Sequence, residues 1–207
     1  ADDSELLELF YRSGCLGLLI GFESFEKDNL AAMGKQVNRR FNDYVSVVNN
    51  LHKHKLAIYG TFVFGYDSDN DQTFRKTLEF VVRNKLFFAA FNHLVPFPGT
   101  TLYDRLREHK KLRREDWWLS QDYRFGDVVF SAENYSSQEL AKRCLQFRNE
   151  FYKMKSILWR ATNLKANCKS VSMALTYFTA NLLSKADVAQ RQGLPFGLED
   201  EGGSDPL

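Results

Sequence analysis

Short apolar runs alternate with segments of helical spacing along the first half of the chain. Three runs are strand candidates: residues 16–22, 56–65 and 87–95. The middle run is rich in β-branched and aromatic residues and lacks strict polar alternation, which is typical of a strand covered on both faces, as in a parallel sheet. Because a helical segment follows each run, the pattern predicts three consecutive strand–helix units in an α/β fold, with right-handed crossovers.

The helices of the first half are predicted from apolar residues at every third or fourth position. They are expected at residues 3–13, 26–33, 41–54, 71–84 and 101–109.

The clearest helix lies in the second half, where Ser136 provides an N-cap and Glu139 follows in capping-box spacing. Its apolar residues recur at steps of four and three: Leu140, Cys144, Phe147, Phe151, Met154 and Leu158. We expect one long helix whose apolar stripe packs in the core or against a partner helix. A last helix is expected over residues 171–185.

The composition of the chain changes after Leu112. Residues 1–112 hold the three strand–helix units, residues 113–192 form a mainly helical extension, and residues 193–207 have lost periodicity and are expected to be disordered. Three units are too few to close a barrel, so residues 1–112 indicate part of a larger α/β body. The free edge of the first strand is then expected to seek a partner, by self-association or domain swapping.

The balance of charges gives little guidance about partners. The chain has 28 basic and 26 acidic side chains, a net charge of +2, which gives no general reason to expect nucleic acid. No apolar run approaches the roughly 20 residues that span a bilayer, and no signal peptide is expected. An odd number of widely spaced cysteines, Cys15, Cys144 and Cys168, fits a reducing cytoplasm and offers no metal-binding spacing.

Unusual residues gather where the predicted strands end, and these ends meet at one edge of a parallel sheet. Glu23 is either an N-cap for the next helix or an acceptor for the ribose hydroxyls of a nucleotide. Gly65 either lets a ligand approach the backbone or supplies positive φ for a turn. His93 is more often a core histidine in such a place, and the turn at residues 96–100 is either structural or pairs with a base edge.

The acidic loop after the middle strand resembles a calcium loop only in part. Asp67, Asp69 and Asp71 alternate, but Gln72 and Leu78 stand where glycine and glutamate are required. A calcium site is therefore not expected.

Three stretches together resemble a known family. IGFES at residues 20–24, TFVFGYDSDN at residues 61–70 and LVPFPGTTLYDRL at residues 94–106 are similar to the second half of a radical S-adenosylmethionine barrel. They match barrel strands four to six of the group whose full-length members carry a cobalamin-binding domain. The extension resembles that of a branch which includes the hopanoid methylases.

The resemblance implies a partial (β/α) barrel and roles for individual residues. The residues implied to contact S-adenosylmethionine are Glu23, Ser24, Gly65, Tyr66, Val95 and Pro96. His93 and Phe97 are assigned to the substrate side. The family's cofactors are S-adenosylmethionine and a [4Fe–4S] cluster, with cobalamin as a further possibility.

The chain departs from the family where the cluster should bind, because it has no Cys-x₃-Cys-x₂-Cys loop. We therefore expect an inactive fragment of an enzyme that acts at unactivated carbon, with methyl transfer as the first choice and a small or lipid-like molecule as substrate. Its expected partner is the missing N-terminal half of the barrel. One alternative is a non-catalytic scaffold that uses the helix at residues 136–158; another is a self-contained nucleotide-binding domain.

Overall fold

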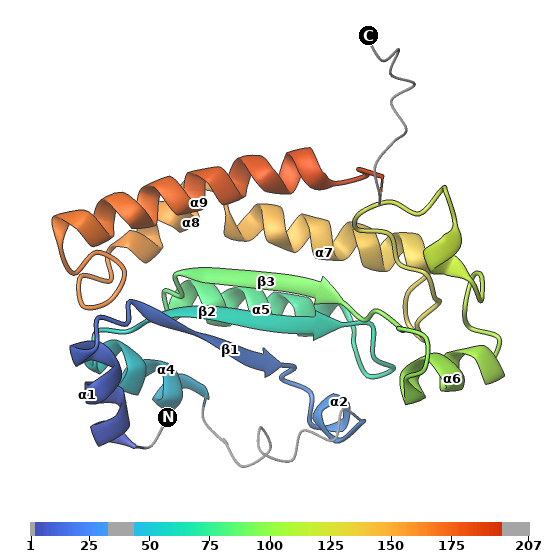
Figure 1. Cartoon of the computed structure of the whole chain (residues 1–207), viewed down its shortest axis with the longest axis horizontal. Coiled ribbons are helices and arrows are strands. Elements are labelled where there is room, and N and C mark those ends of the chain that lie inside the picture. Colours follow the sequence, from blue (N-terminus) through green and yellow to red (C-terminus); the bar gives the residue numbers. More distant parts are fainter. Residues whose placement is uncertain (1–2, 33–43, 196–207) are drawn as a thin grey trace, which may run out of the picture.

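The structure, a computed structural model, describes residues 3–32 and 44–195. It is a mixed α/β fold (Figure 1). Its elements in chain order are α1 (Ser4–Arg12), β1 (Gly17–Glu23), α2 (Lys27–Ala32), α4 (Tyr44–Lys53), β2 (Ala57–Phe64), α5 (Asp71–Arg83), β3 (Phe88–His93), α6 (Thr101–Glu108), η1 (Trp117–Leu119), α7 (Ser137–Phe151), α8 (Met154–Ala161) and α9 (Val171–Arg191).

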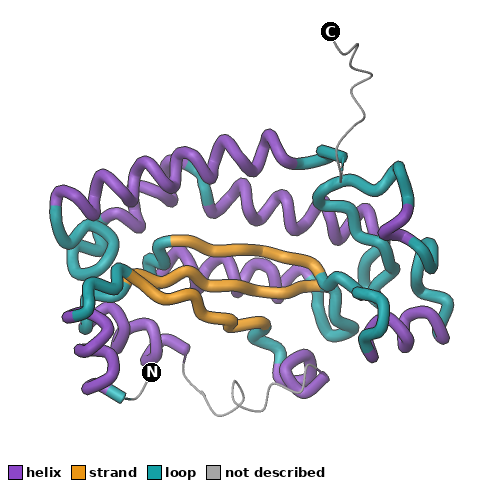
Figure 2. The backbone as a smooth tube through the Cα atoms, in the orientation of Figure 1, coloured by secondary structure: helices purple, strands orange, loops and turns teal. Residues whose placement is uncertain are grey.

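The three predicted strands form one parallel sheet in the order β1-β2-β3. Gly17 of β1 pairs with Ala57 of β2, and Tyr59 of β2 pairs with Phe88 of β3. The strands therefore run in the same direction, as Figure 2 shows. The expected α/β class and the parallel sheet are confirmed.

One face of the sheet is covered by helices and is built largely from phenylalanine. Phe64 stacks on Phe74 of α5 with ring centroids 3.9 Å apart, and Phe22 and Phe62 pack around Phe80 of the same helix. These side chains are buried, and aromatic pairs at such separations add to the free energy gained from burial. Alternate residues of each strand form this face.

The opposite face of the sheet is only partly covered. Leu19 of β1 is 67% exposed and Tyr59 of β2 is 38% exposed, while Thr61 and Val63 are half-buried and Asn92 of β3 is exposed. Partners in register share a face in a parallel sheet. This half-apolar surface is called the open face below.

The two edges of the sheet differ. Along β3, helix α7 packs closely, and Arg148 of α7 donates a hydrogen bond to the carbonyl oxygen of Phe91 at 3.0 Å. Along β1, no described strand pairs with the outer edge. An unpaired strand edge is a ready template for another strand.

The prediction of a single long helix is wrong in one respect, because the chain forms two helices that are separated after Phe151. Tyr152 ends α7, and Lys153 adopts an extended conformation with ψ 144° before α8 begins. The apolar stripe is buried as far as Phe151, whereas Met154 and Leu158 are 42% and 55% exposed. The stripe is therefore core over α7 alone.

Arg160 explains the break. Its guanidinium is fully buried and donates five hydrogen bonds: to Ser156, the carbonyls of Leu86, Phe87 and Phe151, and Asn181. In a continuous helix the carbonyl of Phe151 would accept from a backbone N–H four residues later. Tertiary contact with Arg160 replaces that bond and joins α7, α8 and α9 to the start of β3.

One hydrophobic core includes residues on both sides of Leu112, from Leu7 of α1 to Tyr152 after α7. A smaller core packs α8 and α9 against Ala57 and Phe87. The division into parts at Leu112 stays a prediction, and the expected disordered tail lies largely outside the described residues. Within the described ranges, no helix has the length and apolar character needed to cross a bilayer.

Candidate functional site

The carboxyl ends of the three strands lie at the same end of the sheet (Figure 1). This end is called the carboxyl edge below, to distinguish it from the outer edges formed by β1 and β3. Glu23 ends β1, Gly65 follows β2, and the turn that begins at Leu94 follows β3. Ligands of parallel α/β folds bind at this edge. The structure thus brings the three predicted strand ends to the same side of the molecule.

Glu23 has a backbone conformation that its surroundings impose. Its φ is +67°, in a region that residues other than glycine rarely adopt. The pairing of β1 with β2 is irregular at the same place, since Gly21 pairs with Thr61 and Glu23 with Phe62. A bulge of this kind redirects a side chain at the end of a strand.

The carboxylate of Glu23 lies over Gly21. A Cβ atom on Gly21 would be 2.5 Å from Oε1 of Glu23 and 3.7 Å from Oγ1 of Thr61. Gly21 shares a face with Thr61, so the carboxylate is placed on the open face at the carboxyl edge. The absence of a side chain at Gly21 makes room for it.

Asp69 connects the ends of β1 and β2. It is completely buried, and its Oδ2 accepts hydrogen bonds from the backbone N–H groups of Gly65 at 2.8 Å and Tyr66 at 3.0 Å. Its Oδ1 accepts from Nδ2 of Asn29 at 2.7 Å, and the same nitrogen donates to Oγ of Ser24. This network fixes the β2 loop relative to the segment after Glu23.

Burial raises the pKa of Asp69 to about 6, although its hydrogen bonds to Gly65, Tyr66 and Asn29 act in the opposite direction. A buried carboxylate without a cation is costly. We interpret Asp69 as a structural acceptor, which the sequence alone did not single out.

Ser24 is buried and makes the polar contacts at the start of α2. Its Oγ accepts a hydrogen bond from the backbone N–H of Glu26 at 3.1 Å. This contact forms a turn just before α2, which begins at Lys27.

Gly65 has φ +109°, so it supplies the positive φ that was one of the two roles expected for it. A Cβ atom there would lie 2.9 Å from both Phe130 and Leu140. The close approach that glycine permits is thus to the C-terminal extension. Tyr66, the next residue, is half-buried, and burial followed by the charge of Glu23 raises its pKa to about 12.

The turn after β3 is fixed by a tryptophan. Nε1 of Trp117 donates to the carbonyl oxygen of Pro96 at 3.2 Å, and the N–H of Phe97 donates to the carbonyl oxygen of Val95 at 3.0 Å. The side chain of Phe97 is exposed, with its ring 6.3 Å from that of Trp117. Both carbonyls of the predicted base-edge contact are therefore engaged within the protein.

His93 lies on the covered side of the sheet, in register with Phe64. Its Nδ1 is 2.9 Å from the carbonyl oxygen of Leu94, and burial lowers its pKa, as does the nearby Arg148. The His93 side chain therefore points to the helix-covered face of the sheet rather than to the open face.

A cavity of about 80 Å³ lies at the same edge, between the β2 loop, α6 and the start of the extension. Tyr66, Arg105, Lys111 and Asp67 provide polar groups, and Leu94 is one of its apolar residues. Arg105 was not among the residues expected at the site. The helical pattern gave no sign that α6 would approach Tyr66.

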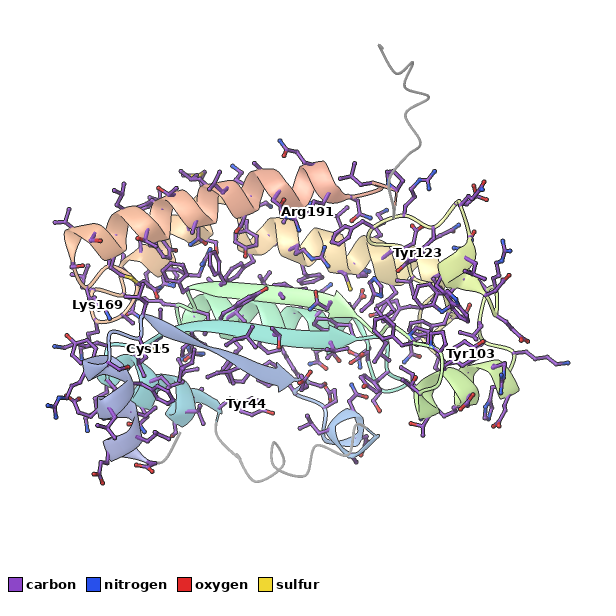
Figure 3. All side chains as sticks on the ribbon, in the orientation of Figure 1. Cys15, Tyr44, Tyr103, Tyr123, Lys169 and Arg191 are labelled. Atoms are coloured by element: carbon purple, nitrogen blue, oxygen red, sulfur yellow. The ribbon has the colours of Figure 1, made fainter. Side chains whose placement is uncertain are left out.

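The cysteines do not come together. Cys15 lies toward the amino ends of the strands (Figure 3), Cys144 is buried in the core, and Cys168 follows α8. Burial raises the pKa of the Cys144 thiol to about 12, which makes it a poor ligand. Over residues 3–32 and 44–195, no group of three His, Cys, Asp or Glu side chains could hold a metal ion.

The three aspartates of the β2 loop also separate. Asp69 is buried as described, Asp71 pairs with Arg143 at 2.7 Å, and Asp67 lies 3.7 Å from Lys111. The three carboxylates therefore have separate partners and do not face one another across the loop.

No protein-family model matches the chain. The chain is 38% identical over 156 residues to the bacteriochlorophyllide d C-12(1)-methyltransferase of Chlorobaculum tepidum. The aligned region covers 75% of this chain and 33% of that protein. The C-8(2)-methyltransferase of the same organism is 27% identical over 77% of this chain and 35% of its own length. The hopanoid C-2 methylase of Rhodopseudomonas palustris is 24% identical over 54% of this chain and 21% of its own length.

These relatives are methyltransferases, and the chain spans about a third of the length of the first two. The comparisons relate the chain to methyltransferases and do not favour the alternative of a non-catalytic scaffold.

Proposed function

We propose that this chain is the C-terminal part of a radical S-adenosylmethionine methyltransferase, in which β1, β2 and β3 form the second half of a partial (β/α) barrel. The observation that carries the proposal is the placement of Glu23 on the open face, beside the carboxyl ends of three parallel strands. Three family-like stretches in register and the similarity to methyltransferases support it.

Within this proposal, Glu23 accepts hydrogen bonds from the ribose hydroxyls of S-adenosylmethionine. Ser24 and Asp69 hold the adjoining backbone, and Gly65 with Tyr66 passes beneath the adenosine. Because Trp117 takes the carbonyl of Pro96 and Pro96 itself is buried, Pro96 would fix the turn and the half-buried Val95 would contact the adenine through its side chain. A fixed turn that presents apolar atoms suits a flat base.

The iron–sulfur cluster does not fit the residues described. A site-differentiated cluster needs closely spaced thiolates, and the three cysteines are dispersed. We therefore place the cluster, and cobalamin if it is used, on the part of the longer protein that precedes this chain. The free edge of β1, with the exposed Leu16 and Leu19 beside it, is the surface that this part would extend with further strands.

For the substrate we propose a polycyclic, largely apolar molecule. The relatives are named for bacteriochlorophyllide, a tetrapyrrole carboxylic acid, and for hopanoids. The open face offers apolar contacts, including Leu19, Tyr59 and Val63. Phe97, exposed in the turn after β3, is a further candidate contact, whereas the covered position of His93 gives it a structural role.

Anaerobic reconstitution tests the proposal. The longer protein that carries this chain is incubated with iron, sulfide and reductant, and visible absorbance and formation of 5′-deoxyadenosine from S-adenosylmethionine are measured. We expect an iron–sulfur absorbance band and cleavage in the longer protein, and neither in the 207-residue chain. A longer protein that binds no cluster would refute the proposal.

A further inference from the structure

We propose that the cavity beside Tyr66 binds a carboxylate of the small-molecule ligand, with Arg105 as the counter-ion. The inference rests on the proposed function, which it deepens by naming one chemical group of the ligand and the residue that recognises it.

The cavity has an apolar floor and a polar rim. Its apolar lining includes Leu94, Leu102, Leu106 and Phe130, which come from the turn after β3, from α6 and from the extension. Its polar side chains are Tyr66, Asp67, Arg105, His109, Lys111 and Ser131. A floor that accepts methylene groups beside the guanidinium of Arg105 is complementary to a short alkyl carboxylate.

The charges of the rim are unequally paired. Nζ of Lys111 lies 2.9 Å from Glu133 and 3.7 Å from Asp67, so its charge is compensated. In the part of the chain that the structure describes, the Arg105 guanidinium has no hydrogen bond or ion pair. Its neighbour on the helix, Arg107, lies 3.2 Å from Asp104 and over the ring of Tyr103.

Tyr66 connects the cavity with the rest of the site. Its phenol experiences the negative charge of Glu23 and the positive charge of Arg105. Tyr66 and Arg105 line the same cavity, and Tyr66 directly follows Gly65 at the carboxyl end of β2. Arginine is well suited to recognise an anionic group there because its planar guanidinium binds a carboxylate through two hydrogen bonds.

The volume limits what can enter. Pockets for drug-sized ligands measure about 300–1,000 Å³, so a cavity of about 80 Å³ is too small for a nucleoside or a tetrapyrrole ring. It suits a single carboxylate with a short stem. Two ligands of the proposed enzyme carry such a group: a tetrapyrrole propionate and the methionine part of S-adenosylmethionine.

Two pairs of probes distinguish these sources in the longer protein that carries the chain. Pyropheophorbide, a chlorin with one propionate, is compared with its methyl ester by fluorescence titration. S-adenosylhomocysteine is compared with its decarboxylated analogue by calorimetry. Each pair is measured for the unaltered protein, for Arg105→Gln, and for Arg107→Gln as the matched control on the same helix. Circular dichroism verifies that both variants fold.

We expect Arg105→Gln to weaken binding of the acid in one of the two pairs by about tenfold or more, the effect of losing a hydrogen bond to a charged group. Binding of the neutral probe of that pair should not change. Arg107→Gln should bind both probes as the unaltered protein does. The pair affected identifies the source. Equal effects on acid and neutral analogue, no effect on either acid, or binding of neither acid by the unaltered protein would overturn the inference. Cluster reconstitution tests the methyltransferase proposal independently.

Discussion

Glu23 differs from the other residues that have positive φ. Among the residues described, Lys55, Lys85 and Lys110 also have positive φ, but each follows the end of a helix. The N–H of each following residue bonds to the carbonyl five residues before it, which is a helix-ending motif. Glu23 stands at the end of a strand, at the centre of a three-residue turn in which the N–H of Ser24 donates to the carbonyl oxygen of Phe22 at 2.9 Å, a conformation that is rare and strained. Strained backbone outside caps is a feature of functional sites, which fits the proposed ribose contact.

The titration of Asp69 gives a prediction at the same scale. Its pKa rises from 3.8 to about 6 on folding, so the folded protein binds this proton more tightly than the unfolded chain. The stability contributed by protonated Asp69 is present below about pH 4 and is lost as the pH rises to about 6.

In the Asp69→Asn variant this position cannot titrate. We therefore compare the unfolding free energy of the unaltered protein with that of the variant at each pH. The unaltered value minus the variant value should fall by about 2–4 kcal/mol from about pH 4 to about pH 6, since one pKa unit corresponds to about 1.4 kcal/mol. Urea denaturation at several pH values measures it. A difference that does not change with pH would contradict the assignment.

Arg160 is expected to be the most costly side chain to remove outside the site. Replacing it with methionine leaves the carbonyls of Leu86, Phe87 and Phe151 without their buried donor. Each buried carbonyl left without a donor costs about 1–3 kcal/mol, so we expect Arg160→Met to lower the free energy of unfolding by about 3–5 kcal/mol. Lys155→Met, an exposed change on the same helix, should cost less than about 0.5 kcal/mol. Comparable losses in the two variants by chemical denaturation would be inconsistent with this role.

At the scale of the elements, the break between α7 and α8 can be tested by whether a substitution at Lys153 raises or lowers the free energy of unfolding. Lys153 occupies the N-cap of α8 and makes no side-chain capping bond. Serine is a preferred N-cap residue, so Lys153→Ser should raise the free energy of unfolding by about 0.5–1 kcal/mol. The exposed ion pair of Lys153 with Glu150 contributes little.

In a continuous helix the same serine would occupy an interior position and reduce stability, as Lys142→Ser within α7 should do by about 0.5 kcal/mol. Thermal unfolding of both variants distinguishes the two arrangements, since destabilisation by Lys153→Ser would mean that the helix does not break there.

The accuracy of the sequence prediction depended on which interactions decide each element. Strand β2 was predicted within one residue of its bounds, because its apolar run ends at the positive-φ Gly65. Helix α5 was equally clear, since Asn70 and Thr73 form its capping box. The α7–α8 break was missed because Arg160 imposes it through contacts with residues distant in sequence. Arg105 was missed for the same reason, because its cavity joins segments that are distant in sequence. Asp69 was considered only as a calcium ligand, although two of its hydrogen bonds are to the nearby residues Gly65 and Tyr66.

At the scale of the whole molecule, the three parallel strands form a sheet that the described helices cover unequally. Helices cover one face and the β3 edge, whereas the open face is only partly covered and no described strand pairs with the β1 edge. In the proposed function, both surfaces would meet the rest of a longer protein. Parallel strands need such covering to bury their apolar surfaces. The arrangement explains why the sequence could indicate a strand-end site yet not a complete one, because the proposed cluster ligands lie outside the chain.

The affinity of the reconstituted longer protein for S-adenosylmethionine, with and without the Glu23 carboxylate, tests the central proposal most directly. Glu23→Gln should weaken binding by about tenfold or more, the effect of losing hydrogen bonds to a charged acceptor. Glu8→Gln, an exposed change on α1 at the amino ends of the strands, should leave it unaltered. An unchanged affinity in Glu23→Gln, or an equal loss in both variants, would contradict the account.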